Sequence, residues 1–239
     1  MVEEKLVVEQ NPREAQLQRV DTLINDLLKR FPEFNYQETK KETLQAAGKF
    51  RKINAITYTA GQNEEEHLRE LLVDRGGSYV LALTPEQEVI LELQVRPGLD
   101  QPYQVELVAG GLDENEEPVV NALKELSQEV GVNNSLGNVA SLGVGPVMAG
   151  RTPQNTHFFL IEGVEIDPNK QQLEKGELII PFTCLLGDVN RFVNRIMTRD
   201  DLREAGFGVD PKILSALSLA AEYFANNGDS ATAKSIFNF

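Results

Sequence analysis

One stretch of chain, residues 110–132, changes its hydrophobic period and thereby limits what this sequence can fold into. It starts with Gly110-Gly111, continues through an acidic loop and ends at Gly131. Its later apolar residues recur at helical spacing: Val119, Leu123, Leu126 and Val130. Apolar residues three and four apart share one face of a helix, and glycine commonly follows a helix end. Because strand-like segments flank this helix, the sequence predicts an α/β fold in which a glycine turn leads from sheet to helix.

The remaining elements follow from short apolar runs bounded by turn residues. Strands are expected over residues 50–59, 68–73, 78–83, 89–95, 139–143, 156–161 and 178–182. Helices are expected over residues 12–31, 35–49, 188–196 and 210–224. The chain then divides into an N-terminal helical extension at 1–49, a main domain at 50–228 and a short tail at 229–239.

Composition narrows the functional classes. The chain has 37 acidic and 23 basic residues, a net charge of −14, so its average surface repels nucleic acids and anionic membranes. No apolar run reaches the length of a membrane span. The single cysteine, Cys184, excludes an internal disulfide, and with only His67 and His157 it is no basis for a structural zinc site. We therefore expect a cytoplasmic protein in which these three side chains are structural.

Carboxylates gather on one face of the predicted helix. Glu125, Gln128 and Glu129 are three and four residues apart, which makes them neighbours on a helix. Mg²⁺ prefers oxygen ligands and commonly takes one or two protein carboxylates, with water and substrate phosphate as the other ligands. The spacing therefore predicts a site for Mg²⁺, with Mn²⁺ as an alternative.

This stretch resembles the Nudix box, in which Gly, five residues, Glu, seven residues and Arg-Glu-aliphatic-any-Glu-Glu-any-Gly-aliphatic follow one another. The residues on the pattern are Gly110, Glu116, Glu125, Leu126, Glu129, Gly131 and Val132. Lys124 stands in place of the arginine and Gln128 in place of the first glutamate of the pair. The flanking segments, over residues 50–224, resemble the ADP-ribose and nucleoside-diphosphate-sugar pyrophosphatases of the Nudix family.

The resemblance implies an α/β/α Nudix sandwich around a mixed sheet, a homodimer, and Mg²⁺-dependent cleavage of a nucleoside diphosphate derivative. The metal ligands it implies are Glu125, Glu129, Gln128 and the carbonyl of Ala109. It further implies a catalytic carboxylate on a later loop, at Glu174 or Glu177, between which the sequence does not choose. The substrate-contacting residues it implies are Arg69, Arg96, Gly110 and Pro146.

Three functions stay open from the sequence. The first is a hydrolase that cleaves ADP-ribose or a related nucleoside-diphosphate sugar. The second is a domain that binds such a nucleotide without cleaving it, because Lys124 and Gln128 depart from the pattern. The third is an interaction subunit whose partner binds residues 1–49. Three of these site residues also have simpler interpretations. Arg96 is then a surface ion-pair residue, and Glu174 and Glu177 belong to a plain exposed loop.

Overall fold

The computed structural model of this chain describes residues 12–30, 52–59, 66–73, 75–132, 136–146 and 148–237, with the side chains of 12, 13, 52–59 and 66–70 excepted. The helix expected over residues 35–49 lies outside these ranges. None of the described helices is long and apolar enough to cross a bilayer.

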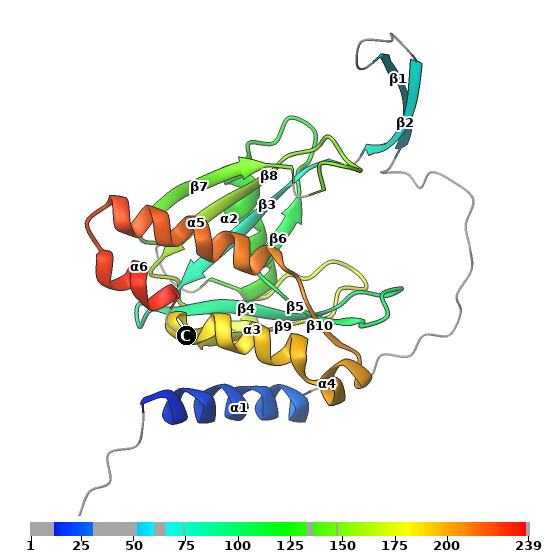
Figure 1. Cartoon of the computed structure of the whole chain (residues 1–239). Coiled ribbons are helices and arrows are strands. Elements are labelled where there is room, and N and C mark those ends of the chain that lie inside the picture. Colours follow the sequence, from blue (N-terminus) through cyan, green and yellow to red (C-terminus); the bar gives the residue numbers. More distant parts are fainter. Residues whose placement is uncertain are drawn as a thin grey trace, which may run out of the picture.

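The predicted elements within the described residues occur in the expected order (Figure 1). The strands are β1 (Lys52–Thr59), β2 (Glu66–Val73), β3 (Gly77–Leu83), β4 (Glu88–Val95), β5 (Tyr103–Glu106), β6 (Val108–Gly111), β7 (Val139–Gly145), β8 (Thr156–Glu162), β9 (Ile179–Leu185) and β10 (Phe207–Val209). The helices are α1 (Pro12–Arg30), α2 (Pro118–Val130), α3 (Val189–Thr198), α4 (Asp200–Glu204), α5 (Lys212–Asn226) and α6 (Ser230–Ile236). Of these strands and helices, β5, β6, α4, β10 and α6 are additional to the predicted elements. Single 3₁₀ turns are η2 (Pro168–Lys170) and η3 (Leu186–Asp188).

Among the described residues, eight strands form one mixed sheet in the order β10-β5-β4-β3-β8-β7, and β6 and β9 branch from it by pairing with β3 and β4. The β3–β8 and β10–β5 pairs are parallel, and the remaining pairs are antiparallel. The sheet therefore branches at β3 and β4, its two central strands. β1 and β2 form a separate antiparallel hairpin that projects from the body of the protein (Figure 1).

Helices cover both faces of this sheet. On one face, Ala122, Leu126 and Val130 of α2 pack into a buried cluster with residues of β3, β4 and β8. On the other face, α1, α3, α5 and α6 enclose a larger cluster whose bulkiest fully buried side chain is Phe192. The expected three-layer α/β/α class with a mixed sheet is thus confirmed.

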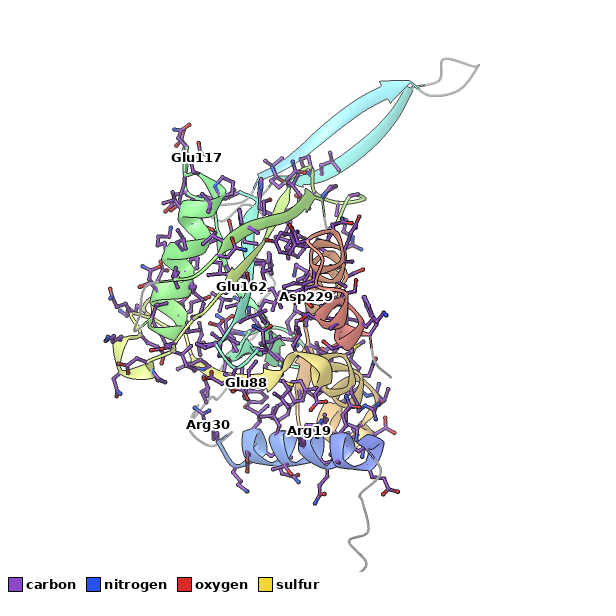
Figure 2. All side chains as sticks on the ribbon, turned by 90° about the vertical axis from the view of Figure 1, so that its left-hand side faces the viewer. Arg19, Arg30, Glu88, Glu117, Glu162 and Asp229 are labelled. Carbon is purple, nitrogen blue, oxygen red and sulfur yellow. The ribbon has the colours of Figure 1, made fainter. Side chains whose placement is uncertain are left out.

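The N-terminal helix α1 is docked on α3. Val20, Ile24 and Leu27 of α1 are buried in the larger cluster, as their helical spacing predicts. Two ion pairs flank this contact, Arg19 with Asp188 at 2.8 Å and Arg195 with Asp21 at 3.1 Å. Figure 2 shows Arg19 on the side of α1 that faces the rest of the protein. The extension is therefore packed against the main domain along α1.

The C-terminal segment differs from the expected tail. Residues 230–236 form α6, which Asp229 caps by accepting a 3.0 Å hydrogen bond from the Thr232 amide. Ile236 is fully buried, and its carbonyl accepts a hydrogen bond from the Asn190 side chain. The apolar pattern of so short a segment is weak, so its helix depends on tertiary contacts. The sequence analysis also missed β5, β6, α4 and β10, because elements of three to five residues carry little periodicity.

Candidate active site

The glycine turn predicted from the sequence lies at the end of β6, and an acidic loop connects it to α2. One lysine of α2 forms ion pairs with the carboxylates of this loop. Lys124 Nζ lies 2.8 Å from Glu116 Oε1, 3.3 Å from Asp113 Oδ2 and 3.7 Å from Glu125 Oε1. Glu116 also accepts a 2.9 Å hydrogen bond from the Asp113 amide. These contacts lower the pKa of Glu116, with the Lys124 hydrogen bond as the largest cause. The lysine that replaces the motif arginine therefore binds the acidic loop.

Asn121 links the same loop to the helix face from inside the protein. Its fully buried amide group lies 3.2 Å from the Gly111 carbonyl, 3.1 Å from Glu116 Oε2 and 3.2 Å from Glu125 Oε1. A buried amide donor placed among three oxygens restrains all of them. The loop, the end of β6 and the carboxylate of Glu125 are thus one connected unit.

The Glu125 carboxylate lies directly over Gly110, so any side chain at this position would displace it. A Cβ atom at position 110 would come within 2.1 Å of the Glu125 carboxyl carbon, far inside van der Waals contact. Gly131, at the other end of α2, has a φ of +67°, and a Cβ there would lie 2.2 Å from the Asp167 carbonyl oxygen. Both motif glycines therefore have steric reasons, one at the carboxylate and one at the helix end.

Glu129 is the most buried acid of the motif. It is 4% exposed, and its Oε2 accepts a 3.1 Å hydrogen bond from the Ala109 amide. Burial raises its pKa to about 8, the Ala109 hydrogen bond opposes the shift, and the charges of Glu125 and Glu177 add to it. Burial likewise raises the pKa of Glu125. The raised pKa values mean that ionising both glutamates is unfavourable. Both line one cavity, where a positive charge would stabilise their ionised forms.

That cavity, the acidic cavity, has a volume of about 430 Å³. Its lining residues include Arg75, Gln94, Arg96, Ala109, Gly110, Gly111, Asp113, Lys124, Glu125, Gln128, Glu129, Glu174 and Glu177. Both loop glutamates therefore reach it. Glu174 is exposed, whereas Glu177 is half-buried and accepts a 2.7 Å hydrogen bond from the Glu174 amide. The charge of Glu177 also raises the pKa values of both Glu125 and Glu129.

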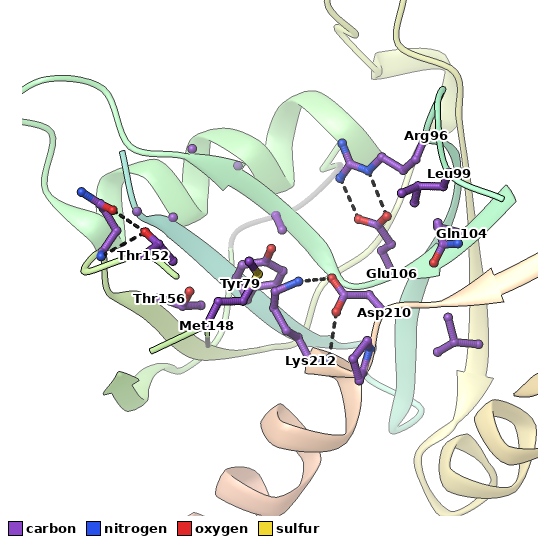
Figure 3. A pocket seen from close by; sticks show the side chains of 18 residues that line it. Tyr79, Arg96, Leu99, Gln104, Glu106, Met148, Thr152, Thr156, Asp210 and Lys212 are labelled. Atoms are coloured by element: carbon purple, nitrogen blue, oxygen red, sulfur yellow. Dashed lines mark hydrogen bonds and ion pairs between the residues drawn. The ribbon is translucent and has the colours of Figure 1, made fainter. Parts of the chain in front are cut away.

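A second, larger cavity of about 640 Å³, the substrate-sized cavity, adjoins the first (Figure 3). Arg96 and the glycine end of β6 line both. The Arg96 guanidinium pairs with the buried Glu106 through two hydrogen bonds of 2.9 and 2.7 Å. Such a two-pronged pair fixes the plane of an arginine and uses two of its five donors. Arg96 is an ion-pair residue, and its guanidinium also lies at the boundary between the two cavities. The ion-pair interpretation of Arg96 is therefore compatible with the interpretation as a substrate contact.

The wall opposite Arg96 combines an aromatic ring with a half-buried ion pair (Figure 3). Lys212 Nζ lies 4.7 Å from the centre of the Tyr79 ring and also hydrogen-bonds Asp210. Met148, Thr152 and Gln154 reach the same cavity from the loop after β7. Ring, cation and carboxylate together offer stacking and hydrogen bonding to a sugar or a base.

The remaining predicted residues are placed as follows. Gln128 lines the acidic cavity from α2. Arg69 pairs with Ile56 in the β1–β2 hairpin, and its side chain is outside the described part of the chain. Pro146 is exposed just after β7 and is not one of the residues that line the substrate-sized cavity. His157 lies in β8, and the Cys184 thiol is buried, with a pKa that burial raises.

Residues that line the substrate-sized cavity escaped the sequence analysis, among them Tyr79, Glu106, Asp210 and Lys212. The buried Glu92, which lines neither cavity but interacts electrostatically with Glu129, escaped it as well. A signal was present for one of them. Glu92 interrupts an otherwise apolar strand, and a charged residue in the middle of a buried strand is rare without a special reason. The others come from elements far apart in sequence, and no local pattern joins them.

The donor set suits a hard divalent cation. In the part of the chain that the structure describes, no three acidic, histidine or cysteine side chains form a ready cage for a metal ion. Mg²⁺ needs no such cage, because it keeps several waters and takes one or two carboxylates. The carboxylate oxygens of Glu125 and Glu129, which line the acidic cavity, fit that demand.

Comparison with known proteins agrees with this geometry, although no family model matches the chain. The chain is 30% identical over 132 residues to an ADP-ribose pyrophosphatase of Bacillus subtilis, a match that covers 55% of this chain and 69% of the relative. It is 28% identical, with the same coverage of both chains, to a methanol dehydrogenase activator of Bacillus methanolicus. With the branched mixed sheet and the glycine–glutamate motif at the start of α2, these likenesses show that the chain belongs to the Nudix hydrolase family.

Proposed function

We propose that this protein is a divalent-cation-dependent pyrophosphohydrolase that cleaves ADP-ribose or a related nucleoside-diphosphate sugar to a nucleoside monophosphate and a sugar phosphate. The observation that carries the proposal is the pair of adjoining cavities, one acidic and one substrate-sized, that share Arg96 and the glycine end of β6. A diphosphate at this boundary would have its phosphates beside the carboxylates and its organic group beside Tyr79. The likeness to an ADP-ribose pyrophosphatase supports this substrate class.

In this proposal Glu125 and Glu129 hold the cation, Mg²⁺ or the chemically similar Mn²⁺, with Gln128 and the Ala109 carbonyl as accessory oxygens. When bound, such a cation neutralises phosphate charge and lowers the pKa of water. The Ala109 amide and the Asn121 amide orient the two glutamates. Arg96, fixed by Glu106, donates hydrogen bonds to a phosphate oxygen.

We assign the water-activating role to Glu177 rather than Glu174. Glu177 is the less exposed of the two and acts electrostatically on both motif glutamates. The hydrogen bond from the Glu174 amide restrains its carboxylate at the rim of the acidic cavity. A restrained carboxylate beside bound substrate can orient a water molecule and accept its proton. The contribution of Glu174 is then its backbone amide, which donates the hydrogen bond to Glu177.

The test is turnover of a substrate panel: ADP-ribose, ADP-glucose, UDP-glucose, GDP-mannose, NADH and diadenosine polyphosphates, with products resolved by anion-exchange chromatography. We expect release of a nucleoside monophosphate from one member with Mg²⁺ and none with EDTA. Glu129→Gln should abolish that release, whereas Glu222→Gln, a change on the exposed side of α5, should leave it intact. Activity that survives Glu129→Gln would contradict the metal assignment.

A second candidate is a nucleotide-binding module without hydrolysis. It is favoured by the neutral Gln128 on the cavity wall and by the likeness to a protein named as a methanol dehydrogenase activator. This candidate predicts no turnover across the panel while ADP-ribose still raises the melting temperature. Gln128→Glu separates the two, because it should create activity in a degenerate site and change little in a working one.

A further inference from the structure

Glu92 lies in the middle of β4 and faces α2. Successive side chains of a strand point to opposite faces of its sheet. Ile90 belongs to the cluster under α2, whereas Leu91 and Leu93 belong to the cluster on the opposite face. Glu92 therefore shares the α2 face with Ile90, and the next residues on that face, Gln94 and Arg96, line the acidic cavity. Glu92 is not itself a lining residue of that cavity, so its buried side chain lies behind the wall to which Gln94 and Arg96 contribute.

The burial of this side chain is unusual. Glu92 is 1% exposed, and its Oε1 has no hydrogen-bond partner among the described residues. An isolated carboxylate in a protein interior is strongly unfavourable, and an apolar residue would serve the strand better. A buried acid without a partner therefore requires an explanation from function.

The charges around Glu92 are mainly negative. Burial raises the pKa of Glu92 well above its usual range, and the charges of Glu129 of α2, Glu106 of β5 and Glu177 of the loop before β9 raise it further. Arg96, which directly follows β4, lowers this pKa, but its guanidinium is already paired with Glu106. Such a group of carboxylates needs further positive charge, which a divalent cation at Glu125 and Glu129 would supply.

We infer that Glu92 is a positioning carboxylate of the divalent-cation site, which acts from behind Glu129 and adds from the sheet the negative charge that Gln128 does not supply from the helix. The inference rests on the proposed function, because it concerns the cation that this function requires. Carboxylates behind the ligands of a metal site commonly set its affinity. The charge of Glu92, on a strand that precedes the motif, would thus compensate for the neutral Gln128 within the motif.

The experiment measures Mn²⁺ binding to the full chain without substrate, by the electron paramagnetic resonance signal of free Mn²⁺. Glu92→Gln keeps the size of the side chain and removes its charge, and we expect it to raise the Kd for Mn²⁺ roughly 10- to 100-fold. Glu88→Gln is the matched control, because Glu88 lies on the same face at the start of β4 and lines neither cavity. This control should leave the Kd unchanged.

Two more variants separate charge from packing. Glu92→Asp keeps the charge and should bind Mn²⁺ more tightly than Glu92→Gln does. Adding Gln128→Glu to Glu92→Gln returns one negative charge to the site and should recover affinity. Equal losses in the Asp and Gln variants would indicate a purely structural role and overturn the inference.

The outcomes also separate this inference from the proposed function. If wild-type protein fails to bind Mn²⁺, the metal-dependent function fails with it. If wild type binds Mn²⁺ and Glu92→Gln binds it equally well, the inference about Glu92 is wrong while the proposed function stands. Melting curves without metal identify variants that fail to fold, and Glu92→Asp then provides the comparison.

Discussion

Lys124 shows how a single residue replaces the arginine of the motif. Its ammonium group lies within 4 Å of carboxylate oxygens of Asp113, Glu116 and Glu125. An ammonium has no planar fork, but its three donors rotate freely enough to serve three acceptors. Because Lys124 keeps the loop joined to the middle of α2, this departure from the pattern is compatible with an ordered site. Gln128, a neutral side chain on the wall of the acidic cavity, is the departure that removes a negative charge from the motif.

Gly110 provides a prediction at the residue scale. A methyl group there would collide with the Glu125 carboxylate, so Gly110→Ala should lower kcat/KM at least about 100-fold in a folded protein, as expected for a misplaced catalytic group. Gly145→Ala is the control, because its Cβ would meet no atom within 4 Å. Circular dichroism checks folding. Full activity of Gly110→Ala would mean that Glu125 has no fixed place in the site.

Cys184 provides a second residue-scale prediction. Burial, followed by the charges of Asp188 and Glu88, raises the pKa of its thiol. Because the thiolate is the reactive form, a raised pKa keeps the group protonated and inert at neutral and mildly alkaline pH. Native protein should therefore react with a disulfide reagent far more slowly than protein unfolded in guanidinium chloride. Equal rates in both states would contradict the burial of this side chain.

At the scale of elements, the end of α2 is tied to the loop that carries Glu174 and Glu177. The Gln128 carbonyl accepts a 2.8 Å hydrogen bond from the Gln172 amide, and the Gly131 carbonyl accepts one of 2.6 Å from the Asp167 amide. The last carbonyls of a helix lack partners within it, so the loop satisfies them. The acids of the loop and of α2 are thereby held on the same side of the acidic cavity.

The docking of α1 yields a prediction at the same scale. Ile24 is 2% exposed in the cluster shared with α3, so Ile24→Ala should lower the free energy of unfolding by roughly 2–5 kcal/mol. Asn25→Ala, on the exposed side of the same helix, should cost little. Urea denaturation measures both. An unchanged midpoint for Ile24→Ala would mean that α1 undocks without affecting the stability of the main domain.

At the scale of the whole molecule, a chain with a net charge of −14 brings three buried acids together, because Glu129 of α2 and Glu106 of β5 both act electrostatically on Glu92 of β4. Mutual repulsion of these acids opposes folding, and a cation bound only by the native state opposes that repulsion. The proposed function therefore implies that folding and cation binding are energetically linked. α1, α3 and α5 lie on the opposite side of the sheet from α2, away from this effect.

This linkage predicts that Mg²⁺ stabilises the whole protein. A cation present at about 100 times its Kd should add about 2.7 kcal/mol to the free energy of unfolding. Thermal melts with Mg²⁺ and with EDTA measure the shift. The double variant Glu125→Gln, Glu129→Gln should show no such shift, and an equal shift in this variant would place the cation elsewhere.

The sequence alone predicted the order of the main elements, the α/β class and the candidate residues of the motif. These depend on local causes: periodicity gives α2, and Glu125 and Glu129 share a face because they are four residues apart on it. The expectation for residues 229–239 missed α6, whose helix depends on contacts with distant residues. Dimer formation and the helix over residues 35–49 stay predictions.

Only the tertiary structure decided which side chains meet the motif. Pairing of β4 with β5 places Arg96 against Glu106, and the start of α5 brings Lys212 to Tyr79 of β3. Glu92 faces Glu129 because β4 passes beneath α2. Local periodicity is determined by neighbours along the chain, whereas these contacts follow from how strands and helices far apart in sequence pack around a common core.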